Sequence, residues 1–264
     1  MRREAIQTCL AAALCAMLGG CVSTGGAHLS GDSSSDKRVE AARVRMELGQ
    51  RYMQEGKLEI ALDNLNKALQ YDDKLVDAHT VIAVLYERIG NLKAAEQHYA
   101  RAAELAPKSG DANNNYGVFL CAEGKFTEAQ KYFSAAMRDP FYKTPDVLLT
   151  NAGTCLVDHA NSSNYDEAER DFRNALQANP KNGAALFYMA KVLYLKNDFF
   201  HARAFIQRFE SQGKPDPAAL LLARNIEVKL GHVDTAHDYA QRLRKDFPDS
   251  TQTHSLDTVA PVSQ

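Results

Sequence analysis

The stretch Val76–Ser109, VDAHTVIAVLYERIGNLKAAEQHYARAAELAPKS, decides the fold of this chain. Its small and aromatic residues recur 34 residues earlier and 34 residues later. The aromatic Tyr99 has Leu65 before it and Phe133 after it. The small residues that recur in the same way are Gly49, Ala83 and Gly117; Ala61, Ala95 and Ala129; Ala68, Ala102 and Ala136; and Gly56, Gly90 and Gly124. A period of this length is typical of a helix–turn–helix repeat.

Each recurring position has a physical role in such a repeat. Small residues stand where two helices approach closely, and the aromatic fills the gap between one helix pair and the next. A glycine such as Gly90 closes the first helix, where a positive φ is needed. Stacked pairs bury the apolar faces that a single pair would expose. The pattern therefore predicts an all-α tetratricopeptide repeat superhelix, an α-solenoid of six helix–turn–helix repeats with a concave inner surface.

The repeats are expected at 42–75, 76–109 and 110–143, followed by three less regular ones. In the fourth, Ala168 follows Gly153 by 15 residues rather than 12, so the turn around Asp158–Asn164 should be longer. Ala202 and Ala236 are again 34 apart and mark repeats five and six. The first helix should begin near Arg38, and the polar tail 250–264 should be disordered.

The first 20 residues predict a lipoprotein signal peptide. A basic start and a short apolar run end in Leu18-Gly19-Gly20-Cys21, the order of a lipobox. The alternative is an ordinary secretory signal in which Cys21 is incidental. Val22, rather than an aspartate, follows this cysteine and favours the outer membrane, on its periplasmic face. Residues 21–37 are then a flexible tether, and 38–249 hold the six repeats.

Nothing in the sequence points to catalysis. The eight histidines are scattered, and no CxxC, HExxH, GxSxG or phosphate-binding glycine loop is present. We therefore expect a non-enzymatic protein without cofactor or metal. The formal net charge of −2 gives no reason to expect nucleic acid as a partner, and we expect a monomer.

Two cysteines remain in the repeats, Cys121 and Cys155, which are 34 residues apart. They lie on the first helices of neighbouring repeats, whose axes should be 8–10 Å apart, within reach of a disulfide. Relative to Gly117 and Gly153 they stand at +4 and +2, so the fit depends on the stagger of the helices. The sequence favours a disulfide over two buried free thiols.

The concave face is the expected binding surface for a partner protein. Periodicity places eight residues there: Met46, Gln50, Met53, Thr80, Val84, Glu87, Asn114 and Val118. The methionines would offer an adaptable apolar floor, or they simply pack beneath the first helix. The run Asn113-Asn114-Asn115 either binds a partner or cross-links backbone groups between repeats.

Several motifs carry a resemblance to a known family. They are Asn114-Asn115-Tyr116-Gly117-Val118-Phe119-Leu120-Cys121, Pro140-Phe141-Tyr142, and Asn151-Ala152-Gly153-Thr154-Cys155. Together with the lipobox and the six repeats, they resemble the type IV pilus biogenesis lipoproteins, the pilotins of the pilus secretin. The resemblance implies an outer-membrane lipoprotein that helps the secretin to localise and to assemble as a ring. It also implies that Cys121 and Cys155 pair.

Two other functions remain open at this point. One is a periplasmic adaptor lipoprotein for outer-membrane protein insertion or for cell-wall enzymes. The other is a peptidoglycan-processing enzyme, for which the sequence supplies no catalytic residues.

Overall fold

The structure is a computed structural model that describes residues 33–159, 164–213 and 216–258. In these ranges the chain forms 13 α-helices and no strand. The helices are α1 (Ser33–Gln54), α2 (Leu58–Tyr71), α3 (Val76–Arg88), α4 (Leu92–Leu105), α5 (Gly110–Ala122), α6 (Phe126–Ala136), α7 (Pro145–His159), α8 (Tyr165–Ala178), α9 (Gly183–Leu195), α10 (Phe199–Glu210), α11 (Pro217–Lys229), α12 (Val233–Asp246) and α13 (Thr251–Thr258). Within the described ranges, no helix is long and apolar enough to cross a lipid bilayer.

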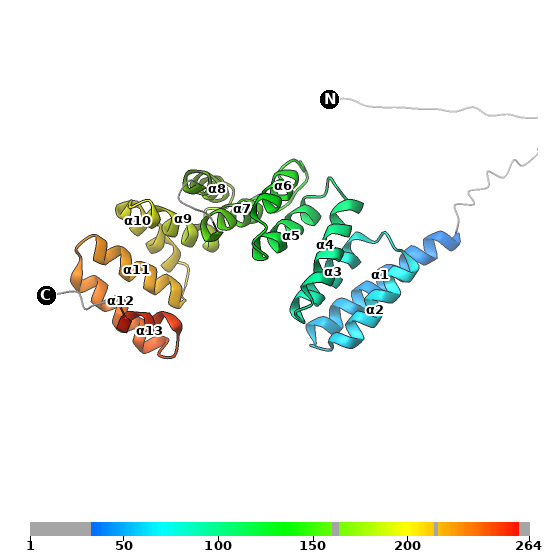
Figure 1. Cartoon of the computed structure of the whole chain (residues 1–264), viewed down its shortest axis with the longest axis horizontal. Coiled ribbons are helices and arrows are strands. Elements are labelled where there is room, and N and C mark those ends of the chain that lie inside the picture. The colour runs from blue at the N-terminus through cyan, green and yellow to red at the C-terminus, as the bar shows by residue number, and fades with distance from the viewer. Residues whose placement is uncertain (1–32, 160–163, 214–215, 259–264) are drawn as a thin grey trace, which may run out of the picture.

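The first twelve helices form six hairpins, from α1–α2 to α11–α12, and the hairpins follow one another along an arch (Figure 1). The first helix of each hairpin packs against the first helix of the next, from α1 on α3 to α9 on α11. In Figure 1, α6 and α8 lie above α5 and α7, and α10 lies to the left of α9, so these second helices are on the outer side of the arch. The predicted six-repeat α-solenoid is therefore confirmed.

Small residues let the two helices of each hairpin come close together. A Cβ atom on Gly117 of α5 would lie 2.8 Å from Cε1 of Phe133 on α6. Gly153 and Phe172 stand in the same relation in the fourth hairpin, again at 2.8 Å. Both phenylalanines are almost completely buried. The 34-residue pattern of small and large residues is thus the pattern of contacts inside the hairpins.

The turn inside most hairpins needs a residue with a positive φ. Gly90, between α3 and α4, has φ 77°. In the fifth hairpin Asn197 takes this place with φ 61°, a conformation that asparagine tolerates better than most residues. The lengthened turn expected in the fourth hairpin falls largely on residues 160–163, which lie outside the described ranges.

Both predicted ends of the repeat region need correction. Helix α1 begins at Ser33, so the last five residues of the predicted tether are helical. The stretch from Asp36 to Ala42 contains no proline or glycine that would stop a helix.

The expected disordered tail contains a helix, α13, which packs on α11 and α12. Its Leu256 is buried at 7% exposure, and the hydroxyl of Thr253 donates to the carbonyl oxygen of Phe247 at 2.6 Å. A short helix therefore covers the apolar end of the solenoid that would otherwise face water. The predicted signal peptide and Cys21 lie outside the described residues.

Candidate protein-binding surface

The eight residues predicted for the concave groove lie on three neighbouring helices, α1, α3 and α5. Val84 on α3 and Val118 on α5 are one period apart, and their side chains are 39% and 41% exposed. Gln50 on α1 is half-buried. These three side chains offer free surface to a partner.

Asn114 does not offer free surface. It is only 6% exposed, and its Oδ1 accepts a hydrogen bond from Nδ2 of Asn151 on α7 at 3.1 Å. Its neighbour Asn113 donates from Nδ2 to the carbonyl oxygens of Pro107 and Ser109, at 3.2 and 2.7 Å. Of the two interpretations of the asparagine run, cross-linking between repeats is the one that the contacts support.

The two methionines serve packing at least in part. Met46 and Met53 are half-buried and pack against the apolar cluster formed by α1, α2 and α3. The carbonyl oxygen of Met53 accepts a hydrogen bond from Nη1 of Arg88 at 3.1 Å, which joins the end of α1 to the end of α3. By helical spacing, Gln50 lies on the same face of α1 as both methionines.

Thr80 and Glu87 are also engaged within the second hairpin. The hydroxyl of Thr80 donates to the carbonyl oxygen of Val76, one turn earlier in α3, at 3.2 Å. Glu87 accepts a hydrogen bond from the hydroxyl of Tyr99 at 2.9 Å and so ties α3 to α4. Burial, followed by the charge of Glu87, raises the pKa of Tyr99 and keeps this donor protonated.

Cys121 and Cys155 form a disulfide between α5 and α7, with their Cα atoms 5.8 Å apart. The offsets of +4 and +2 from Gly117 and Gly153 are therefore compatible with the bond. Cys155 is 2% exposed and belongs to the apolar cluster that joins the second, third and fourth hairpins. The bond holds the third hairpin to the fourth.

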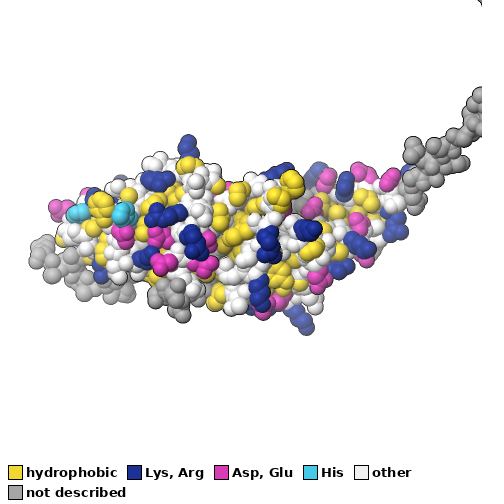
Figure 2. Space-filling view, turned by 90° about the horizontal axis from the view of Figure 1, so that it is seen from above, with side chains coloured by type: hydrophobic (Ala, Val, Ile, Leu, Met, Phe, Trp, Pro, Cys, Tyr) yellow, Lys and Arg dark blue, Asp and Glu magenta, His cyan; other side chains and the backbone are white. Residues whose placement is uncertain are grey.

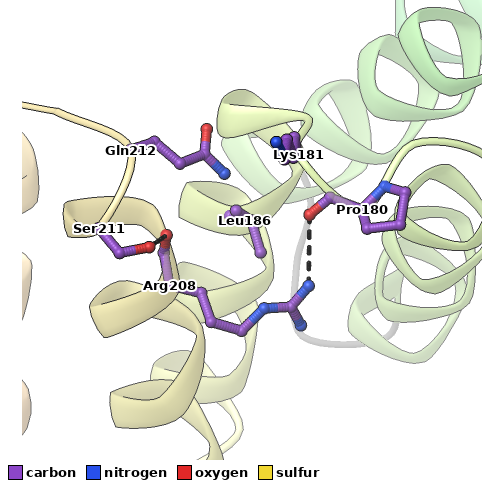
Figure 3. Close-up of a pocket in the computed structure, with 6 residues that line it drawn as sticks. All are labelled: Pro180, Lys181, Leu186, Arg208, Ser211 and Gln212. Carbon is purple, nitrogen blue, oxygen red and sulfur yellow. Dashed lines mark hydrogen bonds between the residues drawn. The ribbon is translucent and has the colours of Figure 1, made fainter.

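A second concave feature was not predicted from the sequence. A cleft of about 460 Å³ lies between the α8–α9 loop and the end of α10, with Leu186 as its apolar floor (Figure 3). Nη2 of Arg208 donates to the carbonyl oxygen of Pro180 at 3.3 Å, and the guanidinium lies 5.2 Å from the ring centre of Phe205. Lys181, Ser211 and Gln212 complete the lining. No periodic signal marks this cleft, because four of its six lining residues lie in loops.

A buried carboxylate was not predicted from the sequence either. Glu227 on α11 is 2% exposed and lies 2.9 Å from Nε of Arg203 and 2.6 Å from Nδ1 of His232. The group joins α10, α11 and the turn that follows α11. Arg203 and His232 lie beside the buried carboxylate of Glu227 and compensate its charge, so the role of this group is structural.

Two observations concern the chemistry that this surface can support. Among the described residues, no group of three or more His, Cys, Asp or Glu side chains is arranged to hold a metal ion. On the face shown in Figure 2, acidic and basic side chains are interspersed with hydrophobic ones. Such a mixed surface suits contacts with other proteins better than binding of a polyanion.

Known families and proteins match this chain over most of its length. Family models described as "TPR repeat" and "Tetratricopeptide repeat" match residues 49–90, 82–143 and 161–226. "Type IV pilus assembly protein PilF" of Pseudomonas aeruginosa is 28% identical over 236 residues, which cover 89% of this chain and 91% of that protein. An uncharacterised protein of Haemophilus influenzae is 38% identical over 116 residues, or 44% of this chain and 65% of the relative.

Two solved structures are similar along nearly their whole length. The crystal structure of PilW, a type IV pilus biogenesis factor, has a TM-score of 0.75 at 27% identity and covers 81% of this chain and 97% of its own. The structure of Pseudomonas aeruginosa PilF has a TM-score of 0.74 at 27% identity and covers 84% and 99%. The tetratricopeptide repeat protein YrrB, at 18% identity and a TM-score of 0.56, shares the fold alone. The chain is a tetratricopeptide repeat protein related to the type IV pilus biogenesis factors PilF and PilW.

Proposed function

We propose that this protein is a non-enzymatic lipoprotein of the outer membrane that binds the type IV pilus secretin and promotes its assembly into multimers. The observation that carries the proposal is the closeness of the similarity. The PilF and PilW structures align over 99% and 97% of their length at 27% identity, with TM-scores of 0.74 and 0.75. YrrB also aligns over 98% of its length, but at 18% identity and a TM-score of 0.56, so sequence identity and the closer superposition, rather than coverage, set PilF and PilW apart.

Two features of the protein have separate roles in this proposal. The lipid on Cys21 attaches the protein to the outer membrane, and the solenoid binds a secretin subunit. Attachment to the membrane raises the local concentration of the two partners, so a modest intrinsic affinity is sufficient. The proposed contact is the inner face of α1, α3 and α5, where Gln50, Val84 and Val118 remain open.

The deciding experiment is an unheated immunoblot of the secretin in separated inner and outer membranes, with and without this gene. Loss of outer-membrane multimers on deletion, restored by the intact gene, supports the proposal. Unchanged and correctly placed multimers would refute a role in secretin assembly and favour the adaptor function.

A Cys21→Ala variant separates the two features. We expect it to fold normally, because none of the described hairpins includes Cys21, and to fail to restore multimers in the outer membrane. Full restoration by this variant would show that the lipid anchor is dispensable.

A further inference from the structure

The loop between α6 and α7 displays the most exposed large hydrophobic side chain among the described residues. Phe141 is 86% exposed, whereas the next, Phe200, is 72% exposed. A single exposed apolar side chain is ordinary on a protein surface, so the exposure of Phe141 is informative only together with the side chains around it.

The loop is braced, so the exposure of Phe141 is a fixed feature of the fold. The carboxylate of Asp139 accepts hydrogen bonds from the backbone N–H of Gly110 at 2.7 Å and from that of Phe141 at 2.9 Å. These bonds hold the pKa of Asp139 below its usual value. The ring of Tyr142 lies against Gly110 and fills the space that a side chain would need there. The residues on either side of Phe141 are thus fixed while its ring projects outward.

The surroundings of Phe141 combine apolar and basic side chains. Met137 and Val147 are 45% and 41% exposed at the two ends of the loop. Arg138 and Lys143 are exposed within it. Three carboxylates lie in this loop or in the first turns of α5 and α7: Asp139, engaged as above, Asp146, which accepts from Asn179 and Asn182, and Asp111. Such a ring flanked by two long cationic side chains suits the interface of a membrane, where the ring enters the headgroup region and the cations reach lipid phosphates.

The position of the loop points to the same partner. The second helix of each hairpin returns toward the end at which the first begins, so the loops that join hairpins belong to the same edge of the solenoid as the start of α1, and this edge turns with the hairpins along the arch. Figure 1 shows the start of α1 at the right-hand end of the arch and the turn between α1 and α2 below it and to its left. Only 11 residues separate Cys21 from Ser33. Fully extended, they span about 40 Å, so a lipid on Cys21 keeps this edge near the membrane.

We propose that Phe141 is an interfacial anchor that enters the headgroup region of the leaflet carrying the lipid on Cys21. The contact turns the hairpin-connecting edge of the solenoid toward the membrane and leaves the concave face accessible from the side. One ring and two cations bind weakly alone, so the contact orients a chain that is already tethered. The inference rests on the lipidation in the proposed function.

The absence of tryptophan from the chain makes a sharp test possible. Phe141→Trp places the only tryptophan of the variant on the loop, where it can be excited selectively over the tyrosines. Phe200→Trp is the matched control, because Phe200 is also highly exposed but lies at the start of α10, at the opposite edge. Each full-length lipidated variant is reconstituted into vesicles of phosphatidylethanolamine and phosphatidylglycerol with brominated acyl chains. We expect emission from Phe141→Trp to shift to shorter wavelength and to be quenched several-fold more than that from Phe200→Trp.

Flotation of the vesicles separates the two proposals. If both variants float and their quenching is equal or absent, the interfacial anchor is refuted while lipidation stands. If Phe141→Trp shifts only when purified secretin is added, the loop is a protein contact and the inference is also wrong. If neither variant floats, lipidation fails, and coupling the Cys21 thiol to a maleimide lipid then tests the loop by the same quenching.

Discussion

The Nδ1 atoms of His79 and His98 lie 3.0 Å apart, where α3 packs on α4 in the second hairpin. One period earlier, the same two positions hold Arg45 and Asn64, whose side chains form a hydrogen bond of 3.0 Å. The position of His98 thus carries a partnered polar residue in the first two hairpins. In the second hairpin both partners are histidines, and only one proton can lie between their facing Nδ1 atoms.

This histidine pair predicts that stability falls in mild acid. Burial, followed by the charge of His79, lowers the pKa of His98 to about 4, and burial also lowers the pKa of His79. Between pH 6.5 and about 4 the unfolded chain therefore binds more protons than the folded one, and the free energy of unfolding decreases as the pH falls. Thermal melts should show a lower Tm at pH 5 than at pH 7.5.

A His98→Gln variant tests the assignment. Glutamine keeps a hydrogen bond to His79 but does not titrate, so the fall in Tm between pH 7.5 and pH 5 should be smaller than in the wild type. His254→Gln, at an exposed histidine on α13, is the control and should follow the wild type. An unchanged pH profile in His98→Gln would place the acid sensitivity elsewhere.

Asp171 on α8 occupies the position of His98 in the fourth hairpin, and the position facing it by repeat register holds Leu149. Burial, followed by the charge of Glu167, raises the pKa of Asp171 to about 6. A raised carboxyl pKa favours the folded state below pH 3.8, and this contribution is lost as the pH rises through about 6. Asp171→Asn removes the buried charge and should stabilise the protein at pH 7.5 by about 1 kcal/mol, after allowance for partial solvent access.

Chemical denaturation at two pH values checks this second assignment. The gain from Asp171→Asn should shrink toward zero at pH 4, where the wild-type carboxyl is protonated in the folded protein. A gain of equal size at both pH values would mean that the charge is not the cause.

The close approach of helices in the third hairpin gives a third prediction. Gly117→Ala would bring a methyl group to 2.8 Å from the ring of Phe133, so the ring or the helices must shift. Overpacking of this kind costs about 1–3 kcal/mol of unfolding free energy. Gly183→Ala is the control, since its Cβ would meet no atom closer than 3.6 Å. Denaturant titrations should show a loss for the first variant and none for the second; equal effects would contradict the packing argument.

The register of Gly117 and Phe133 explains why the fold could be predicted from the sequence. A contact that is repeated in every hairpin produces a periodic pattern of small and large residues in the sequence, and this pattern locates the helices. Helix α13 has no such pattern, because a single apolar residue, Leu256, covers the end of the solenoid. Helix α13 could be predicted only from the apolar surface that the last hairpin would expose without it.

The candidate site was predicted less completely, for a related reason. Periodicity places Asn114 on α5, but its hydrogen bond to Asn151 depends on the stagger between α5 and α7. The exposure of Phe141 depends on Asp139, which braces a loop that has no period. Spacing therefore identifies a helix face, while the engagement of each side chain comes from contacts between hairpins.

The bond between Cys121 and Cys155 predicts a measurable share of the stability. It closes a loop of 34 residues, and the chain-entropy model assigns such a crosslink roughly 3–4 kcal/mol. A double variant, Cys121→Ser with Cys155→Ser, should lose about this amount in guanidinium titrations. Reductant should lower the stability of the wild type and leave the variant unchanged. Peptide mapping under non-reducing conditions should find the linked peptides, whereas two alkylatable thiols would contradict the bond.

The inner face of α3 and α5 supplies the last prediction, on secretin binding. Val84 and Val118 are exposed one period apart, and neither is needed for the core. Val84→Glu with Val118→Glu should leave the helical content unchanged. Burying one valine contributes roughly 1.5 kcal/mol, and about 1.4 kcal/mol corresponds to a tenfold change in affinity. The double variant should therefore weaken capture of the secretin by at least about tenfold.

Ile60→Glu is the matched control for this change. Ile60 is 47% exposed on α2, the second helix of the first hairpin, so the variant adds one carboxylate outside the inner face of α1, α3 and α5, the same change in charge as either single valine variant. Normal capture by Ile60→Glu and weak capture by the valine variant would assign binding to the inner face. The reverse result would move the contact to the outer helices, because a new carboxylate weakens only the interface in which it becomes buried.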